Sequence, residues 1–419
     1  MTIPTSPLRI CMRLALMGSR LKLKLYLMCG LTDFATFVVV FAVSRGLAEL
    51  QAAPWVLGLV GGGLSFSAAI GSLLGGWLPN RIDVRAVFLS GAGILVLSIA
   101  ACWFGDFHNT WFVPAYWSLG IGLGLLYPPL IGWLNQGENP HANRHAVSRT
   151  LILFCVAWNL GMMCGQLMAG ALFPFGRSWV YGAALLGAIP NLLLAFVVAF
   201  QVVPLATTSI GKTQYALESL ELAAAFKRLS WIANLGGMFG ASIIIHLLPD
   251  LAVAIGVRSQ DHGKLLASWR AVIIGTYLLM HHTAHWHYRF GTALASQTLA
   301  ACGLLVIARS ESTLTLLVGL TLLGQLVGYN YFSGLFYSTA GSPDERRALA
   351  AGIHEATLAG GMAIGTMAGG VFGSVGGRRM PYVAAAGVML VLTVVQSTAW
   401  WRWVRPLHRQ KTGTATQMS

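Results

Sequence analysis

Four ionisable side chains lie inside long apolar stretches of the sequence: Asp33, Arg270, His354 and Glu355. A charge in the hydrocarbon region of a membrane costs about 3 kcal/mol on insertion scales, so such residues usually persist because they function. A carboxyl group in this setting can load a proton on one side of a membrane and release it on the other. Asp33, in "CGLTDFATFVV", and Glu355, with His354 beside it to tune it, are therefore candidate proton-coupling residues.

Structural roles for the same residues stay open at this point. Asp33 can hydrogen-bond to Thr32 or to a neighbouring helix, and His354 and Glu355 can bond across the interface between the two halves. Arg270 can bind an anionic substrate. The sequence favours instead an ion pair between Arg270 and Asp250, which lies near a predicted helix end, because a long Arg side chain reaches toward the membrane surface.

A histidine cluster offers a different chemistry. The segment "HHTAHWH" contains His281, His282, His285 and His287, and two of them are one helical turn apart, a spacing that suits a shared metal ion. A membrane di-iron enzyme needs several such clusters, and the other histidines of the sequence form no second one. We therefore expect no enzyme, no metal and no cofactor, and keep a membrane metalloenzyme as a minor alternative.

The composition indicates that these residues belong to a membrane protein. Of the 419 residues, 56% are hydrophobic and only 10% are charged, which no water-soluble domain could accommodate. The net charge of +14 falls in short connectors, so it predicts membrane orientation and no nucleic-acid partner. Runs of about 20 apolar residues predict an all-α polytopic membrane protein with twelve transmembrane helices, at 25–44, 54–78, 86–104, 110–134, 146–173, 178–203, 231–255, 263–284, 290–308, 313–338, 348–376 and 381–403.

The distribution of Lys and Arg predicts the topology. The even connectors and both ends of the chain are rich in these cations, which indicates that both termini are cytoplasmic and that the protein spans a plasma or inner membrane. Few cations fall in the odd connectors: Arg45, Arg177, Arg258, Lys264, Arg309, Arg378 and Arg379.

The domain organisation follows from one long connector, 204–230. Its segment "QYALESLELAAAFKRLS" has apolar residues at helical spacing and predicts an interfacial amphipathic helix. This helix would join two six-helix bundles, 25–203 and 231–404. The remaining segments are a cytoplasmic arm, 1–24, and a cytoplasmic tail, 405–419.

An internal repeat supports the division into two bundles. The segments "WNLGMMCGQLMAG" (158–170) and "LAGGMAIGTMAGG" (358–370) align at an offset of 200 residues, on the fifth and eleventh predicted helices. Glycines four residues apart let two helix backbones approach closely, so these are predicted packing surfaces. The glycines concerned are Gly161, Gly165 and Gly170 in one half and Gly361, Gly365 and Gly370 in the other.

The connector "GGWLPNRIDVRAV" (75–87), between the second and third predicted helices, resembles the loop signature G-x-L-x-D-R-x-G-R-R/K of the major facilitator superfamily. The whole chain is similar to that family in helix count, half-repeat, central loop and charge asymmetry. In the family this loop is cytoplasmic and latches the two halves in the outward-facing state. Asn80 stands where the family usually has Asp and can accept a hydrogen bond at a helix N-terminus. The matching latch residues are Gly76, Leu78, Asn80, Arg81 and Arg85.

The resemblance implies a function. In this superfamily the first, fourth, seventh and tenth helices line a central cavity, which gives the candidate substrate residues Tyr127, His246, Gln325, Tyr329, Asn330 and Tyr331, with Arg270 as a further candidate. It implies a monomeric secondary active transporter that moves a small organic solute across the lipid bilayer by alternating access, with protons as the candidate coupling ion. A transport-inactive receptor or scaffold of the same fold is the alternative.

Overall fold

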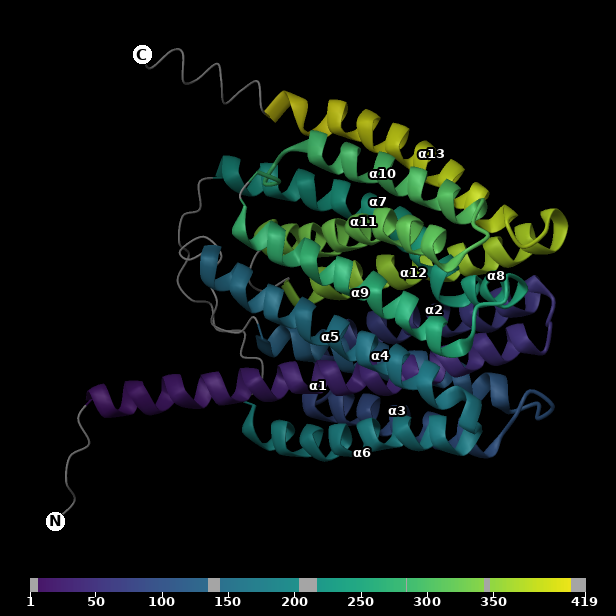
Figure 1. Ribbon diagram of the computed structural model, residues 1–419. Helices are drawn as coiled ribbons and strands as arrows, with labels where there is room; N and C mark the ends of the chain where they lie inside the picture. Colours follow the sequence, from purple (N-terminus) through teal and green to yellow (C-terminus); the bar gives the residue numbers. More distant parts are fainter. Residues whose placement is uncertain (1–6, 135–143, 203–216, 284, 343–346, 408–419) are drawn as a thin grey trace.

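The computed structural model describes residues 7–134, 144–202, 217–283, 285–342 and 347–407, and these form helices and connectors without a strand. Twelve long helices run nearly parallel in one bundle (Figure 1). The first half contains α1 (Pro7–Glu49), α2 (Pro54–Trp77), α3 (Val84–Phe104), α4 (Phe112–Leu134), α5 (Arg144–Leu172) and α6 (Arg177–Gln201). The second half contains α7 (Leu217–His246), the short α8 (Leu248–Ala254), α9 (Ser259–His282), α10 (Phe290–Ala308), α11 (Thr313–Ala340), α12 (Arg347–Gly376) and α13 (Met380–Trp403).

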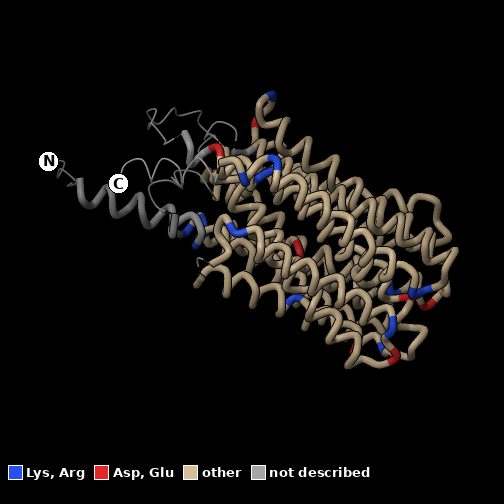
Figure 2. Tube along the Cα trace, turned by 90° about the horizontal axis from the view of Figure 1, so that it is seen from above, with Lys and Arg blue, Asp and Glu red and all other residues tan. Residues whose placement is uncertain are grey.

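The chain is an integral multi-pass membrane protein. Among the described residues, 11 helices are long and apolar enough to cross a membrane. The twelfth long helix, α9, is not among these apolar helices, and it carries Asp261, Lys264 and Arg270. It nevertheless packs inside the bundle, where Trp269 is fully buried. Figure 2 shows that most charged residues lie toward the two ends of the bundle. The predicted fold class is confirmed.

The two halves repeat the same helix packing. In the first half α1 packs on α5 and α6, and α4 packs on α2 and α3. In the second half α7 packs on α12 and α13, and α11 packs on α9 and α10, which is the same set of pairs with α7 in the place of α1. This equivalence is what a duplicated six-helix unit requires.

Two helix pairs join the halves: α2 packs along α12, and α5 packs along α9. We call the end of the bundle where α1 begins and α13 ends the terminal end, at the left of Figure 1, and the opposite end the far end. At the far end both pairs approach through glycines, Gly58 with Gly370 and Gly170 with Gly263, and Arg45 also donates to the Val257 carbonyl of the other half. A Cβ added at Gly58 would come within 2.8 Å of the Cα of Gly370, so a larger residue would separate the halves there.

Three predicted boundaries differ from the structure. Helix α1 begins at Pro7, inside the segment predicted as an arm. The predicted amphipathic helix is not a separate element from Leu217 onward, because that part continues directly into α7 and buries Phe226 in the bundle; residues 203–216 lie outside the described residues. The seventh predicted helix is broken after His246, because Pro249 starts the separate helix α8.

Candidate functional site

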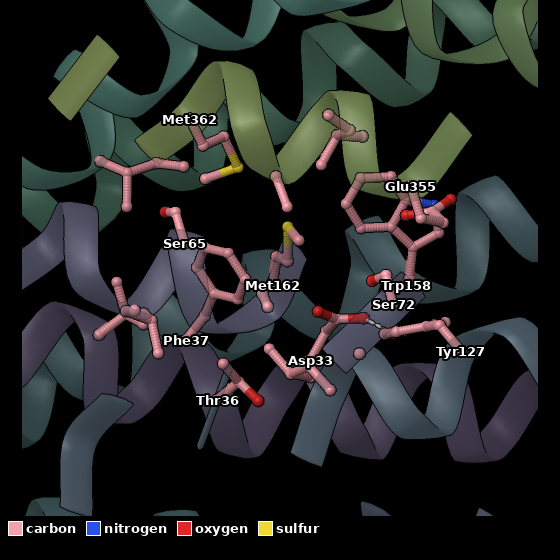
Figure 3. Close-up of a pocket in the computed structure, with 18 of the residues that line it drawn as sticks. Asp33, Thr36, Phe37, Ser65, Ser72, Tyr127, Trp158, Met162, Glu355 and Met362 are labelled. Atoms are coloured by element: carbon pink, nitrogen blue, oxygen red, sulfur yellow. Dashed lines mark hydrogen bonds between the residues drawn. The ribbon is translucent and has the colours of Figure 1, made fainter. Parts of the chain in front are cut away.

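A cavity of about 120 Å³ lies between the two halves (Figure 3). Its walls come from α1, α2, α4 and α5 of the first half and from α7, α11 and α12 of the second. This volume has room for several water molecules, each of which needs about 10–15 Å³ on the same measure. Two carboxyl groups face it, those of Asp33 and Glu355, and no Lys or Arg is among the described residues of its lining.

Asp33 lies on α1 and is 3% exposed. The hydroxyl of Tyr127, on α4, donates a hydrogen bond to its Oδ2 atom (Figure 3). Pro128 and Pro129 follow Tyr127 inside α4. The bond from Tyr127 is the bond to a neighbouring helix that the structural alternative allowed, whereas the Thr32 hydroxyl accepts from the amide of Asn191. The Asp33 carboxyl therefore faces the cavity with one oxygen bound to a tyrosine.

Glu355 lies on α12 and is half-buried at the cavity wall. The hydroxyl of Tyr331, on α11, donates to its Oε1 atom at 2.9 Å. The Tyr331 ring packs against the ring of Trp158, on α5 of the first half, with centroids 4.8 Å apart. Each half of the molecule thus supplies one carboxyl bound to a tyrosine, and the second pair is covered by an indole from the first half.

Arg270 lies beside the cavity but does not line it. It is 2% exposed, and its guanidinium group is 4.4 Å from the ring centroid of Trp269 and 5.2 Å from that of Phe37. Its Nε and Nη2 atoms have no hydrogen-bond acceptor among the described residues. Arg270 and Asp33 interact electrostatically, although no ion pair within 4 Å joins these two described side chains. The Phe37 ring, which lines the cavity, also contacts the Arg270 cation.

The two histidines of the predicted site are both buried but differ in position. His246 lines the cavity, and its Nδ1 atom is 3.3 Å from the hydroxyl oxygen of Ser44, on the other half. His354 does not line the cavity, although it precedes Glu355 in the sequence, and the expected bonding of these two residues across the halves is not seen, because both bond within the second half. Its Nδ1 atom lies 3.4 Å from the Asn234 amide nitrogen, so its ring is held within the second half between α7 and α11.

Three predicted cavity residues point elsewhere, which corrects the prediction for Gln325, Tyr329 and Asn330. The first two contact α10, where the Gln325 amide bonds to Ser296 and the Tyr329 hydroxyl lies 3.0 Å from that of Thr292. The Asn330 amide donates to a backbone carbonyl of α7. Residues i and i+4 share one helix face and i+2 lies on another, so only Tyr331 of this segment reaches the cavity.

Asp250 pairs with Arg378 and not with Arg270, which corrects the predicted ion pair. The Arg378 Nε atom lies 3.0 Å from both carboxylate oxygens of Asp250. Arg378 follows α12 in the sequence and reaches Asp250 on α8 at the far end. Burial raises the pKa of Asp250, and the nearby Arg378 cation opposes that shift.

Replacing Arg378 with Gln is expected to lower stability by about 1–3 kcal/mol at alkaline pH, because the ionised Asp250 carboxylate then lacks its partner. The loss should shrink at acidic pH. A buried acid with a raised pKa binds its proton more readily in the folded state than in the unfolded state, so protonation relieves the penalty. Thermal melting of the purified variant at both pH values tests this. Arg379→Gln, whose guanidinium is 3.7 Å from exposed Glu311, is the matched control, and an equal loss there would contradict the account.

The predicted latch residues lie at the terminal end. Gly76 approaches Gly352 of the other half, and the Arg81 guanidinium stacks on Trp77. Arg85 donates to the carbonyl of Val202 within its own half. The N-cap of α3 is Asp83 and not Asn80, because the Asp83 carboxylate accepts from the Arg85 backbone amide. Arg81 and Arg85 contact Trp77 and Val202 of the first half, so their action as a latch stays a prediction.

The repeat glycines serve two kinds of packing. Gly161 and Gly165 lie against the backbone of α1, and Gly361 and Gly365 lie against that of α7, so these four pack helices within each half. Gly170 and Gly370 pack across the halves, on α9 and α2 respectively. Equivalent glycines therefore make equivalent packing contacts in the two halves.

The histidine cluster does not form a metal site among the described residues, where no group of three His, Cys, Asp or Glu side chains could hold an ion. The rings of His281 and His282 on α9 meet edge to face, and His287 stacks on Trp286 in the following connector, at a centroid distance of 4.0 Å. Residue 284 lies outside the described residues.

Several solved structures share this arrangement of helices. The human organic anion transporter MFSD10 (TETRAN) superposes with a TM-score of 0.68 at 17% identity, over 90% of this chain and 99% of that chain. A bacterial homolog of the human lysosomal transporter Spinster, inward-facing and unoccupied, has a TM-score of 0.67 at 15% identity, over 96% and 99%. A chain solved for substrate recognition in proton dependent oligopeptide transporters has a TM-score of 0.67 at 13% identity, over 94% and 99%. The fold is that of these transporters.

The sequence comparisons, in contrast, found no match. No protein-family model matches the sequence, and no curated protein sequence matches it. The structural likeness is thus carried by helix arrangement and not by residue identity.

Most of the apolar cavity wall was not predicted from the sequence. Phe154, Trp158 and Met162 line it from α5, and Leu358 and Met362 line it from α12. Their spacing by four residues is the signal that could have found them, because such residues share one helix face. They lie on the helices of the glycine repeat, which the sequence assigned to packing alone.

Proposed function

We propose that this protein is a proton-coupled secondary active transporter that moves a small organic solute by alternating access. The observation that carries the proposal is the cavity between two equivalent helix bundles, with a tyrosine-bound carboxyl from each half in its wall. The fold it shares with solved transporters supports it. The protein would act as a monomer without a cofactor, since both halves of the cavity come from one chain.

Asp33 is the proposed proton carrier. A buried carboxyl is more stable when neutral, and the cavity gives it access to water, so a proton can bind and leave. Arg270, on the opposite half, adds a positive charge whose distance from Asp33 depends on how the halves are arranged. A change of conformation would therefore change the proton affinity of Asp33, which is what coupling requires.

A solute screen in proteoliposomes with an imposed pH gradient tests the proposal. We expect at least one small organic solute to accumulate when the gradient is present and to equilibrate when an ionophore collapses it. Binding of a solute without flux would identify a receptor instead, which is the second candidate function. Flux that ignores the pH gradient would identify a uniporter or coupling to another ion.

We propose that the terminal end faces the cytoplasm, with the bundles at 25–203 and 231–404 as the two moving halves. The excess of Lys and Arg at that end supports this orientation. Reporters fused after residue 84 and after the C-terminal tail should both report the cytoplasm, and one near Asp106 should report the outside. An odd number of crossings between residues 84 and 419 would overturn this topology.

The connector 75–87 provides a further prediction. If Arg81 and Arg85 latch the terminal end when it closes, replacing both with Gln should favour the inward-facing state and slow transport without changing membrane insertion. In the present structure the contacts of Arg81 and Arg85 are with Trp77 and Val202 of their own half, so contacts of these cations with the other half would form in another state. Solute flux in proteoliposomes measures the effect, and unchanged turnover in the double variant would leave these cations with a topological role only.

A further inference from the structure

Of the two acids in the cavity wall, Glu355 is the one without a cationic partner among the described side chains. Among the described side chains, no Lys, Arg or His forms an ion pair with it, and its carboxyl group accepts a hydrogen bond from the Tyr331 hydroxyl. Asp33 differs, because Arg270 interacts with it electrostatically. The two carboxyl groups of the cavity are therefore not equivalent.

The groups that interact with Glu355 are acids, and His246, which lines the same cavity from α7, bonds instead to Ser44. Glu355 interacts electrostatically with titratable groups from α1, α4, α5, α9 and α11, each of which is neutral or negative in its two protonation states. These groups are Cys29, Asp33, Tyr127, Cys155, Tyr277 and Tyr331. His354 is adjacent in sequence but bonds toward Asn234 on α7.

The charges of this region do not balance. With both carboxyls ionised, Asp33, Glu355 and Arg270 leave one net negative charge between the halves. An uncompensated charge in a membrane interior is costly, so a cation must neutralise it whenever it forms. Arg270 is not that cation for Glu355, because its guanidinium lies behind the Phe37 ring and outside the lining.

The wall beside Glu355 suits an organic cation with an apolar body. The Trp158 ring lines the cavity near Glu355 (Figure 3), and it packs on Tyr331, which binds Glu355. An indole face attracts a cation by about 0.5–2 kcal/mol, most strongly away from water. The adaptable side chains of Met162 and Met362 and the ring of Phe154 complete an apolar surface for the rest of the molecule.

We propose that the transported solute is a small monovalent organic cation with an aromatic or alkyl body, whose charge is bound between the Glu355 carboxylate and the Trp158 ring. This inference rests on the proposed transport function and adds the class of substrate to it. A proton and the solute then compete for the same carboxylate, so binding of the cation releases a proton when Glu355 is protonated beforehand.

Three probes that share a phenethyl body test the inference: phenethyltrimethylammonium, phenethyl alcohol and 3-phenylpropionate. Their charges are positive, zero and negative, and the charge of the first does not depend on pH. We expect isothermal titration of the purified full chain to show that the cation binds about tenfold or more tightly than the other two. Its affinity should fall as the pH falls, because protonation of Glu355 removes the counter-charge.

Variants separate this site from the proposed proton carrier. Glu355→Gln should weaken binding of the cation by about tenfold and remove the pH dependence of its affinity, while Asp33→Asn should keep a pH dependence, because Glu355 still titrates. Trp158→Leu should weaken the cation by about threefold or more without a matching change for the alcohol. The thermal melting of each variant shows whether it is folded, and the alcohol serves as an internal control of the cavity.

The outcomes distinguish the two proposals. Tighter binding of 3-phenylpropionate, or of the alcohol, would overturn the cation site, and the first result would point to Arg270 as an anion site. If none of the probes binds while the solute screen finds pH-driven flux, the cation inference fails and the transport function stands. If the cation binds through Glu355 but is not transported, the cation site stands and the transport function fails.

Discussion

Replacing Asp33 with Asn is expected to abolish accumulation driven by a pH gradient while leaving exchange down a solute gradient intact. The amide keeps the volume of the side chain and can still accept from the Tyr127 hydroxyl, but it cannot titrate. It therefore imitates a permanently protonated carboxyl. A gradient of one pH unit supports about tenfold accumulation when one proton is coupled to one solute molecule. The variant should show none.

The measurement is uptake of the solute from the screen into proteoliposomes, with counterflow as the control for intact exchange. Glu355→Gln is the matched acid variant in the same cavity. The proton carrier would be Glu355 if Glu355→Gln abolished accumulation driven by the pH gradient without changing the affinity for the solute. In that case Asp33→Asn would still accumulate the solute normally. If neither substitution matters, protons are not the coupling ion.

Tryptophan at Gly58 and Gly263 together is expected to hold the far end open and stop transport. A Cβ at Gly58 would lie 2.8 Å from the Cα of Gly370, and one at Gly263 would lie 2.7 Å from the carbonyl of Gln166. Both contacts are with backbone across the halves, so a large side chain can be accommodated only by separating α2 from α12 and α5 from α9. The cavity would then face the far side in most molecules.

Labelling from the far side measures this shift. With Cys in place of Ser65 in the cavity wall, an impermeant maleimide added at the far side should react faster in the double Trp variant than in its parent. The control is Trp at Gly93 and Gly275, which have no heavy atom within 4 Å of an added Cβ and should change neither labelling nor flux. Equal labelling in both double variants would show that the glycine contacts do not hold the far end closed.

Hydropathy and charge were enough to predict the helices and their grouping. The twelve apolar runs correspond to the twelve long helices, because spanning a membrane imposes length and composition on each segment. The repeat of Gly170 and Gly370 was visible as spacing, but its contacts with Gly263 and Gly58 were not, because they depend on how two distant helices meet. Asp33 and Glu355 were found because buried charge is rare in such a chain.

The errors at the site have a common cause. Gln325, Tyr329 and Asn330 were assigned to the cavity from their helix alone, without the rotation of α11 that turns them toward α10 and α7. The partner of Asp250 was sought among residues close along the predicted helices, whereas Arg378 reaches it from the end of α12. Charge and length are local properties of a sequence, but helix rotation and pairing are set by packing between helices.

The central claim is that protonation of Asp33 controls alternating access. Its most direct test is the distance between spin labels at His108→Cys and Glu311→Cys, two exposed positions on different halves at the far end. The background has Cys11, Cys164 and Cys302 replaced by Ser. The account predicts a short and a long distance whose populations exchange between acidic and alkaline pH, and populations that no longer respond to pH in Asp33→Asn. A single distance at every pH, or the same pH response in Asp33→Asn, would contradict it.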